Sequence, residues 1–220
     1  MRFEYLGIAD DVRSDYRETW DHQRDVHARV AAGELDDTTI FVQHAPVYTA
    51  GRRTEPQERP FDGTPVVDVD RGGKITYHGP GQLVGYPIVT LPDGVGVVDY
   101  VRRVEEAVIR TLAGYGLTTG RVADRTGVWL ERDGLRPERK ICAIGIRVSK
   151  RTTLHGFALN VASEASGPFA NIIPCGITDA GVTTIEDELG RALTLDQVAH
   201  DLEPHLAELL AFRPYESAVG

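Results

Sequence analysis

Apolar residues recur every three or four positions in three long stretches of the chain, which is the spacing of one helix face. The first stretch predicts a helix over residues 11–32, with Gly33 placed to end it. The second predicts a helix over residues 97–115, and the third a helix that opens at Thr194. A short helix is expected after Thr184. The inward-facing side of the first helix is predicted to consist of Val12, Tyr16, Trp20, Gln23, Val26 and Val30.

Shorter apolar runs lie between these helices and predict strands. The runs cover residues 40–42, 65–70, 83–89, 127–131, 140–148 and 153–161. Helices and strands follow one another without a linker, and only residues 52–64 and the tail after Phe212 are expected to be weakly structured. The sequence therefore predicts a single α/β domain over residues 1–220, with a mixed, largely antiparallel sheet flanked by helices.

The composition is typical of a globular protein. A chain of 220 residues can bury a full core, and 41% of its residues are hydrophobic and 26% charged. No apolar run approaches the roughly 18 residues of a membrane span, and no signal peptide is recognisable at the start. Two cysteines are too few for a disulfide framework, which predicts a reducing, cytoplasmic location. The net charge of −9 argues against nucleic acid, so neither nucleic acid nor a membrane is expected as a partner.

Residues 71–82 are unlike a packed core. They combine two glycine-bearing turns with Arg, Lys, Thr, Tyr, His and Gln side chains. Glycine lets the main chain approach a bound group closely, so this segment predicts a ligand-binding loop. The alternative is a long hairpin connection rich in turn-forming residues. Residues 72–74 have the glycines and lysine of a phosphate-binding loop, but the rest of that motif is absent.

Cys175 and Lys140 are the strongest candidates for catalytic chemistry. Cys175 lies between Pro174 and Gly176, where the chain is expected to turn and the N–H of Gly176 could donate to an oxyanion. Lys140 opens an apolar strand, an uncommon place for a lysine. A neighbouring ammonium lowers the pKa of a thiol and raises its thiolate fraction, so the pair predicts a nucleophile and its activator. The alternative is that Cys175 is a small buried apolar residue.

Several segments together closely resemble the lipoyl(octanoyl) transferase family. They are residues 44–52, 71–82, 126–129, 140–147, 155–160 and 174–176, and the resemblance is strongest over residues 44–184. It implies the α/β fold shared by the catalytic domains of lipoate and biotin protein ligases. It also implies an octanoyltransferase that acts in protein lipoylation and lipoate biosynthesis.

The resemblance also implies residue roles. Cys175 matches the cysteine of the family that accepts the acyl group, and Lys140 matches the lysine that lowers the pKa of this cysteine and handles protons. Three further segments match those that line the acyl substrate. Their residues are Arg71, Gly72, Gly73, Lys74, Ile75, Thr76, Tyr77, His78, Ala143, Ile144, Gly145, Gly156, Phe157 and Ala158.

The reaction implied by the resemblance is a two-step acyl transfer through a Cys175 thioester. The donor would be octanoyl-acyl carrier protein, and the acceptors would be lipoyl domains of 2-oxoacid dehydrogenase E2 subunits and the glycine cleavage H protein. No cofactor, ATP or metal is expected. The histidines on predicted helices lack the spacing of metal ligands. His78 and His155 fall in matching motifs and are equally well interpreted as substrate contacts or as hydrogen-bonding residues of a turn.

Two other functions remain open from the sequence. An ATP-dependent lipoate–protein ligase shares the fold, but it activates its acid as an adenylate and needs no cysteine nucleophile. A non-catalytic module that binds the acyl carrier would need neither Cys175 nor Lys140.

Two details of the chain add to this picture. Cys142 stands where the family usually has a smaller residue, and in a regular strand it faces the same side as Lys140; the favoured interpretation is a filler of an alanine-sized space. An acidic carrier needs a local basic patch on this acidic chain, and residues 147–151 or the pair Arg52 and Arg53 could supply it.

Overall fold

The structure is a computed structural model that describes residues 1–134, 136–172 and 180–218. Its helices are α1 (Tyr16–Ala31), α2 (Val97–Gly114), α3 (Ile185–Leu189) and α4 (Leu195–Leu209), with 3₁₀ turns at Pro56–Glu58, Ser163–Ala165 and Gly167–Asn171. Its strands are β1 (Arg2–Leu6), β2 (Thr38–Val42), β3 (Val47–Ala50), β4 (Val66–Asp68), β5 (Thr76–His78), β6 (Gln82–Ile88), β7 (Gly120–Val122), β8 (Arg125–Leu130), β9 (Arg139–Ser149), β10 (Thr152–Asn160) and β11 (Gly181–Val182).

The strands form a large and a small sheet. The large sheet has the order β1-β2-β6-β10-β9-β8-β7, with β11 paired to β9, and the small sheet has the order β4-β3-β5. The pairs β1–β2, β9–β11 and β3–β4 are parallel, and the other pairs in both sheets are antiparallel. The prediction of an α/β fold with a mixed, largely antiparallel sheet is confirmed.

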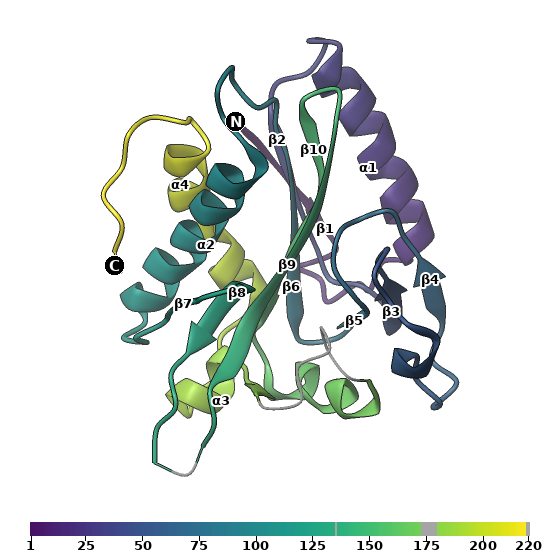
Figure 1. Cartoon of the computed structure of the whole chain (residues 1–220), viewed down its shortest axis with the longest axis vertical. Coiled ribbons are helices and arrows are strands. Elements are labelled where there is room, and N and C mark those ends of the chain that lie inside the picture. The colour runs from purple at the N-terminus through teal and green to yellow at the C-terminus, as the bar shows by residue number, and fades with distance from the viewer. Residues whose placement is uncertain (135, 173–179, 219–220) are drawn as a thin grey trace.

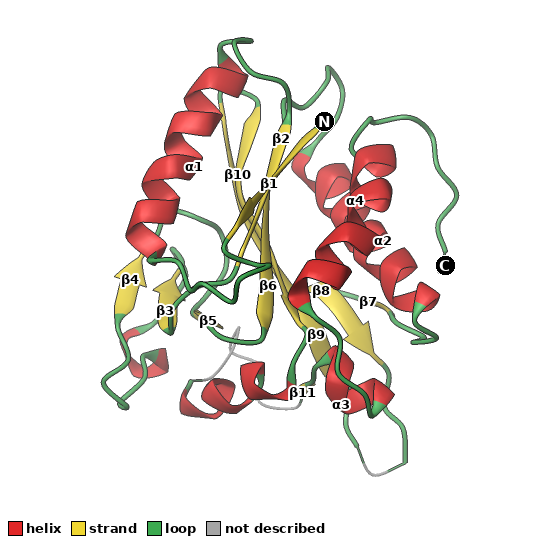
Figure 2. Ribbon diagram, turned by 180° about the vertical axis from the view of Figure 1, so that it is seen from behind, coloured by secondary structure: helices red, strands yellow, loops and turns green. Residues whose placement is uncertain are grey.

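Helices cover both faces of the large sheet (Figures 1 and 2). Helix α1 lies on one face and buries Val26 and Val30 against apolar side chains of β2 and β6. Helices α2 and α4 lie on the other face, where their apolar stripes share the largest core cluster with β9 and β10. The large sheet is thus covered on both sides, which explains why every residue of β2, β6 and β10 is buried, with no alternation between buried and exposed positions.

The first helix begins later than the sequence predicts. The side chain of Asp15 accepts hydrogen bonds from the N–H groups of Arg17 (2.8 Å) and Glu18 (3.0 Å), which is an N-cap, so α1 starts at Tyr16. Val12 lies before the cap and is 56% exposed. Its predicted place on the buried face is therefore wrong, because the capping side chain and not the apolar spacing sets the start of the helix.

The predicted strands omit β1, β3, β5, β7 and β11. These have two to five residues each, too few to show a periodicity of two. Their pairing is decided by distant partners, as when β1 pairs in parallel with β2 more than thirty residues later in the chain. In the described part of the chain, no helix has the length and apolar character needed to cross a bilayer.

Candidate active site

Arg71 organises the glycine-rich segment. It is 6% exposed, and its guanidinium donates hydrogen bonds to the carbonyls of Gly72 (2.9 Å), Lys74 (2.8 Å) and Thr49 (2.7 Å). The loop is therefore folded around its own arginine. This closeness requires Gly51, where a Cβ would lie 2.5 Å from the Gly73 carbonyl and 2.6 Å from the Arg71 guanidinium.

The side chains of strand β5 alternate between a cavity and a separate apolar cluster. Thr76 and His78 line a cavity beneath the glycine-rich loop. Ile75, just before the strand, and Tyr77 face away and pack in a separate cluster whose other buried members include Tyr48. Within β5, therefore, only Thr76 and His78 line this cavity, as the alternation of a strand requires, and the substrate-contact role of residues 71–78 stays a prediction.

Two cavities lie on either side of a shared wall. The wall consists of Gly73, Lys74, Ala143, Ile144 and Gly145. The narrow cavity, of about 60 Å³, is further lined by Tyr16, Arg71, Thr76, His78, Val84, Tyr86, His155, Gly156, Phe157 and Ala158. The wide cavity, of about 420 Å³, is further lined by Arg53, Gly72, Val97, Val101, Asp124, Arg125, Thr126, Lys140 and Ile146.

The structure brings the three predicted substrate-lining segments together at this wall. Residues 143–145 of β9 and residues 156–158 of β10 are paired neighbours, and the glycine-rich loop meets them, with Gly72 on the side of the wide cavity. Sequence reasoning missed Tyr16 on α1 and Tyr86 on β6. Their signal was weak, because a tyrosine in a helical stripe or a buried strand is first interpreted as core.

Hydrogen-bonded histidines lie beside the narrow cavity. His78 contacts the Gln82 amide oxygen through Nδ1 (2.8 Å), and His44 contacts the Tyr86 hydroxyl through Nε2 (2.8 Å). Burial lowers the pKa of His78 to about 3, helped by neighbouring His44. Burial likewise lowers the pKa of His44 to about 4. Both rings are therefore neutral near pH 7.

A chain of amide hydrogen bonds runs from His78 towards the end of β10. Gln82 Nε2 donates to Asn160 Oδ1 (2.9 Å), and Asn160 Nδ2 donates to the Thr183 carbonyl (3.0 Å). The Thr183 N–H in turn donates to the Lys140 carbonyl (3.0 Å). The narrow cavity and the Lys140 backbone are thus tied together by buried polar contacts.

His155 is held in an unusual position in β10. Its backbone φ is +59°, uncommon for a residue other than glycine, and its side chain is 2% exposed. The ring Nε2 lies 2.8 Å from Asp70 Oδ1, and Asp70 also pairs with Arg147. The His155 ring therefore reaches the narrow cavity with a fixed carboxylate partner.

Lys140 lies on the wall of the wide cavity beside an aromatic ring. Its Nζ is 4.6 Å from the centroid of the Trp129 ring on the adjacent strand β8, within the range of a cation–π contact. A Cβ at Gly127 would lie 2.4 Å from the Cys142 carbonyl and 3.5 Å from Cε of Lys140. Glycine at this position lets β8 approach β9 closely where Lys140 leaves the strand.

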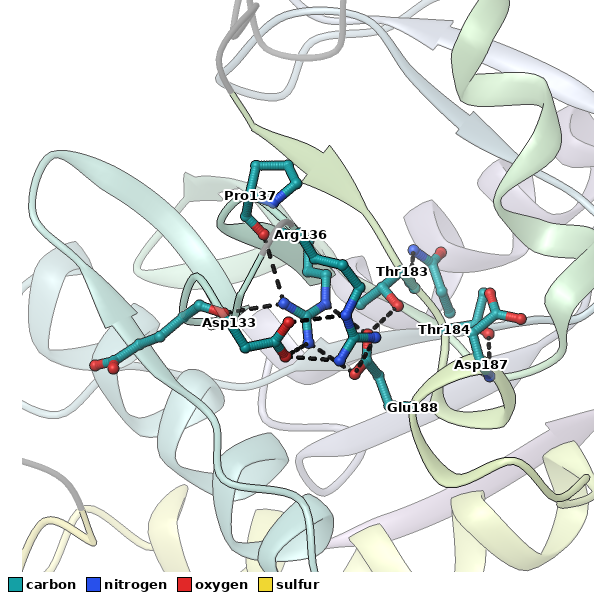
Figure 3. Close-up of polar contacts among 10 residues, drawn as sticks. Asp133, Arg136, Pro137, Thr183, Thr184, Asp187 and Glu188 are labelled. Carbon is teal, nitrogen blue, oxygen red and sulfur yellow. Dashed lines mark hydrogen bonds and ion pairs between the residues drawn. The ribbon is translucent and has the colours of Figure 1, made fainter.

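A buried ionic network fixes the chain that follows the Cys175 segment (Figure 3). Arg139, next to Lys140, donates to both carboxylate oxygens of Glu188 (2.6 and 2.8 Å). Asp133 also pairs with Arg139 (2.8 Å), and Thr183 donates to Glu188 (2.6 Å). The hydrogen bonds from Arg139 lower the pKa of Glu188, so this carboxylate stays charged. The network holds β11 and α3 against β9 at Lys140.

The two cysteines differ in what can be said of them. Cys175 lies outside the described residues. Cys142 is fully buried in the main core cluster, and burial strongly raises the pKa of its thiol. A thiol that resists ionisation is a poor nucleophile, so the position agrees with the interpretation of Cys142 as a space-filling residue. Within residues 1–134, 136–172 and 180–218, no three His, Cys, Asp or Glu side chains are grouped to hold a metal ion.

Comparison with solved structures defines the fold class. The bipartite lipoate protein ligase of Thermoplasma acidophilum matches with a TM-score of 0.68 at 16% identity, covering 100% of this chain and 86% of that chain. The biotin protein ligase of Aquifex aeolicus matches with a TM-score of 0.53 at 12% identity, covering 96% and 69%. The fold is that of the catalytic domains of lipoate and biotin protein ligases, as the sequence predicts.

Sequence comparison defines the family. The family model of the lipoyl protein ligase A/B catalytic domain matches residues 15–207. An octanoyltransferase of Cutibacterium acnes is 61% identical over 225 residues, which span 98% of this chain and 82% of the relative. The chain therefore belongs to the lipoyl protein ligase A/B catalytic-domain family, and within it to the octanoyltransferases. The resemblance stated from the sequence is confirmed.

Proposed function

We propose that this acyltransferase moves an octanoyl group from octanoyl-acyl carrier protein to the target lysine of lipoyl domains, through a thioester on Cys175. In the first step the Cys175 thiolate attacks the donor's thioester carbonyl. The bond from that carbonyl to the carrier's sulfur breaks, and the leaving thiolate takes a proton. In the second step the lysine amine of the lipoyl domain attacks the Cys175 thioester, an amide forms and the Cys175 thiolate leaves.

The observation that carries the proposal is the shared wall between the two cavities. The narrow cavity has neutral histidines, apolar side chains of β6 and β10, and an arginine whose described hydrogen bonds go to its own loop and to Thr49. Such a lining suits an apolar acyl chain. The wide cavity is open and contains Lys140, so a thioester placed at the wall would have its chain on one side and an ammonium on the other.

Lys140 is proposed to act on protons at that wall. As an ammonium beside Cys175 it favours the thiolate, and as a neutral amine it accepts the proton that the incoming lysine loses. Cys175 is seven residues before Val182, which pairs directly with Lys140 in β9. Seven residues of chain span at most about 25 Å, so the length of the chain allows Cys175 to reach Lys140.

The decisive experiment is intact-mass analysis of the protein after incubation with octanoyl-acyl carrier protein and no ATP. We expect an octanoyl adduct that maps to Cys175 and disappears when an apo lipoyl domain is added, as the domain gains the same mass. A Cys175→Ser variant should form no thioester adduct, whereas Cys142→Ser should form it normally.

Other outcomes would replace the proposal. Modification of the lipoyl domain only with free octanoate and ATP would identify a ligase. Binding of the carrier without any acyl transfer would identify a non-catalytic module. Loss of the adduct in Cys142→Ser with its retention in Cys175→Ser would reverse the assignment of the nucleophile.

A further inference from the structure

The outer rim of the wide cavity combines exposed arginines with exposed valines. We propose that this rim, formed by Arg52, Arg53, Val97 and Val98, docks the acidic carrier protein that delivers the acyl group. The inference rests on the proposed function and assigns its donor a place on the surface. The cavity inside the rim is where the thioester arm of that carrier would enter.

The two arginines are fixed at the backbone and exposed at the side chain. The N–H of Arg52 donates to the Arg71 carbonyl (3.2 Å), and the N–H of Arg53 donates to the Gly73 carbonyl (3.1 Å). Within the described part of the chain, neither guanidinium has an ion-pair or hydrogen-bond partner, and both residues are exposed. On a protein of net charge −9, two adjacent cations without an acidic partner create a local region of positive electrostatic potential.

The valines lie across the cavity from the arginines, at the start of α2. Val97 is 47% exposed and Val98 is 73% exposed. Arg53 and Val97 both line the wide cavity, and Figure 1 shows α2 and the small sheet on opposite sides of β9. An apolar contact bordered by charge is the usual composition of a transient protein interface.

The charges within the cavity also favour an acidic partner. Lys140, Arg125 and Lys74 line it together with a single described acid, Asp124. Lys74 pairs with Glu58 and Arg125 with Glu138, which leaves the cations of the rim as the groups most available to a partner. The volume of about 420 Å³ exceeds the needs of one lysine side chain and suits a long amide-containing arm, which favours the carrier over the lipoyl domain as occupant.

The other basic cluster expected from the sequence, residues 147–151, is less suited to docking the carrier protein. Arg147 pairs with Asp70, and Arg151 pairs with Asp93 (2.9 Å) and donates to the Leu91 carbonyl (2.6 Å). Lys150 lies in the turn after β9, ten residues beyond Lys140. Ten residues of strand span about 33 Å, so Lys150 lies far from Lys140 along β9, and the two arginines of the cluster already have acidic partners.

The test compares two octanoyl donors in the transfer to a saturating lipoyl domain. One donor is octanoyl-acyl carrier protein, and the other is octanoyl-pantetheine, which has the same thioester without the protein. We expect Arg53→Glu to lower the ratio of the two kcat/KM values, carrier over pantetheine, by about tenfold or more. Arg53→Lys should keep most of the ratio, and Lys150→Glu, a matched charge reversal, should change it less than about twofold. The salt dependence of the carrier reaction should also become shallower in Arg53→Glu.

Three results would overturn the docking site. Equal losses in Arg53→Glu and Lys150→Glu would mean that net charge alone steers the carrier. An unchanged ratio in Arg53→Glu would mean that the carrier binds elsewhere. A rise in the KM for the lipoyl domain, with the carrier ratio intact, would assign the rim to the acceptor. Failure of the unmodified protein to use either donor would instead refute the proposed function.

Discussion

The narrow and the wide cavity share one wall and differ in charge and access. Beside the narrow cavity, His78 and Tyr86 have hydrogen-bond partners within the protein, Gln82 and His44 respectively. Burial keeps its histidine neutral and raises the pKa of Tyr16 to about 12, so its tyrosine stays protonated. The wide cavity is bordered by exposed cations and by exposed valines at the start of α2.

This difference follows from the two faces of strand β9. Ala143 and Gly145 have little or no side chain, so the wall between the cavities is thin. A thin wall lets one reacting group meet an apolar chain from one side and a mobile partner from the other. Under the proposed mechanism, the narrow side holds the acyl chain through both steps, whereas the wide side admits the donor first and then the acceptor.

The largest expected effect tests whether the size of the narrow cavity sets the preferred length of the acyl chain. Ala158 is 3% exposed and lines the narrow cavity only. Ala158→Leu should fill space that an eight-carbon chain needs and lower the preference for octanoyl over butanoyl thioesters by about tenfold or more, since each methylene is worth about tenfold or more. The measurement is kcat/KM for butanoyl, hexanoyl and octanoyl donors.

A matched variant on the other side serves as the control for chain length. Val101→Leu adds one methylene to the wide cavity and should leave the chain-length preference unchanged. Equal shifts in chain-length preference in the two variants would mean that the narrow cavity is not the one that selects the acyl chain. Urea unfolding of Ala158→Leu should show a loss of about 1–3 kcal/mol from overpacking, which is small enough for the fold to survive.

A smaller effect is expected from the ring beside Lys140. Trp129→Leu removes the aromatic face 4.6 Å from the Lys140 ammonium, and a cation–π contact of about 0.5–2 kcal/mol corresponds to roughly two- to thirtyfold in kcat. Trp129→Phe keeps a ring face and should retain most of the rate. Both variants lose the hydrogen bond from Trp129 Nε1 to the Arg125 carbonyl, so their difference isolates the ring. Equal rates in the two variants would contradict a positioning role for the ring.

Sequence reasoning succeeded where the signal was local. The long periodic stripes became α2 and α4, and the strands with continuous apolar runs became β6, β9 and β10. Lys140 stood out because a lysine is uncommon at the start of an apolar strand; it lines the wide cavity, and its catalytic role stays a prediction. These features depend on residues within one element, which the sequence displays directly.

Sequence reasoning failed where a distant contact decides the outcome. The sequence does not indicate that the pairing of β5 with β3 places Ile75 and Tyr77 in a separate cluster, and their predicted substrate contact stays a prediction. Nor does it indicate that the Arg71 guanidinium donates to the Gly72 and Lys74 carbonyls of its own loop. Tyr16 reaches the narrow cavity only because α1 packs across the sheet. Neither the periodicity nor the composition of the sequence indicates these contacts.

The smallest expected effect is on the pH dependence of stability, which tests whether the histidines beside the narrow cavity are neutral. The ordinary pKa of 6.5 falls to about 3 for His78 and about 4 for His44, because burial disfavours the charged rings. The unfolded chain binds protons at these residues below pH 6.5, whereas the folded chain does not. The stability associated with the neutral rings is therefore fully present above pH 6.5 and is lost as the pH falls towards 3–4, by up to about 1.4 kcal/mol per pH unit for each ring.

Urea unfolding at pH 7, 6 and 5 would show this slope in the free energy of unfolding. His78→Gln removes one of the two titrating rings and should make the slope shallower, whatever it does to stability at pH 7. Arg53→Gln, on the wide cavity, should leave the slope unchanged, because an arginine stays charged in both states over this range. A slope that is insensitive to His78→Gln would mean that the ring is already protonated in the folded protein. The narrow cavity would then contain a charge, and the contrast with the wide cavity would disappear.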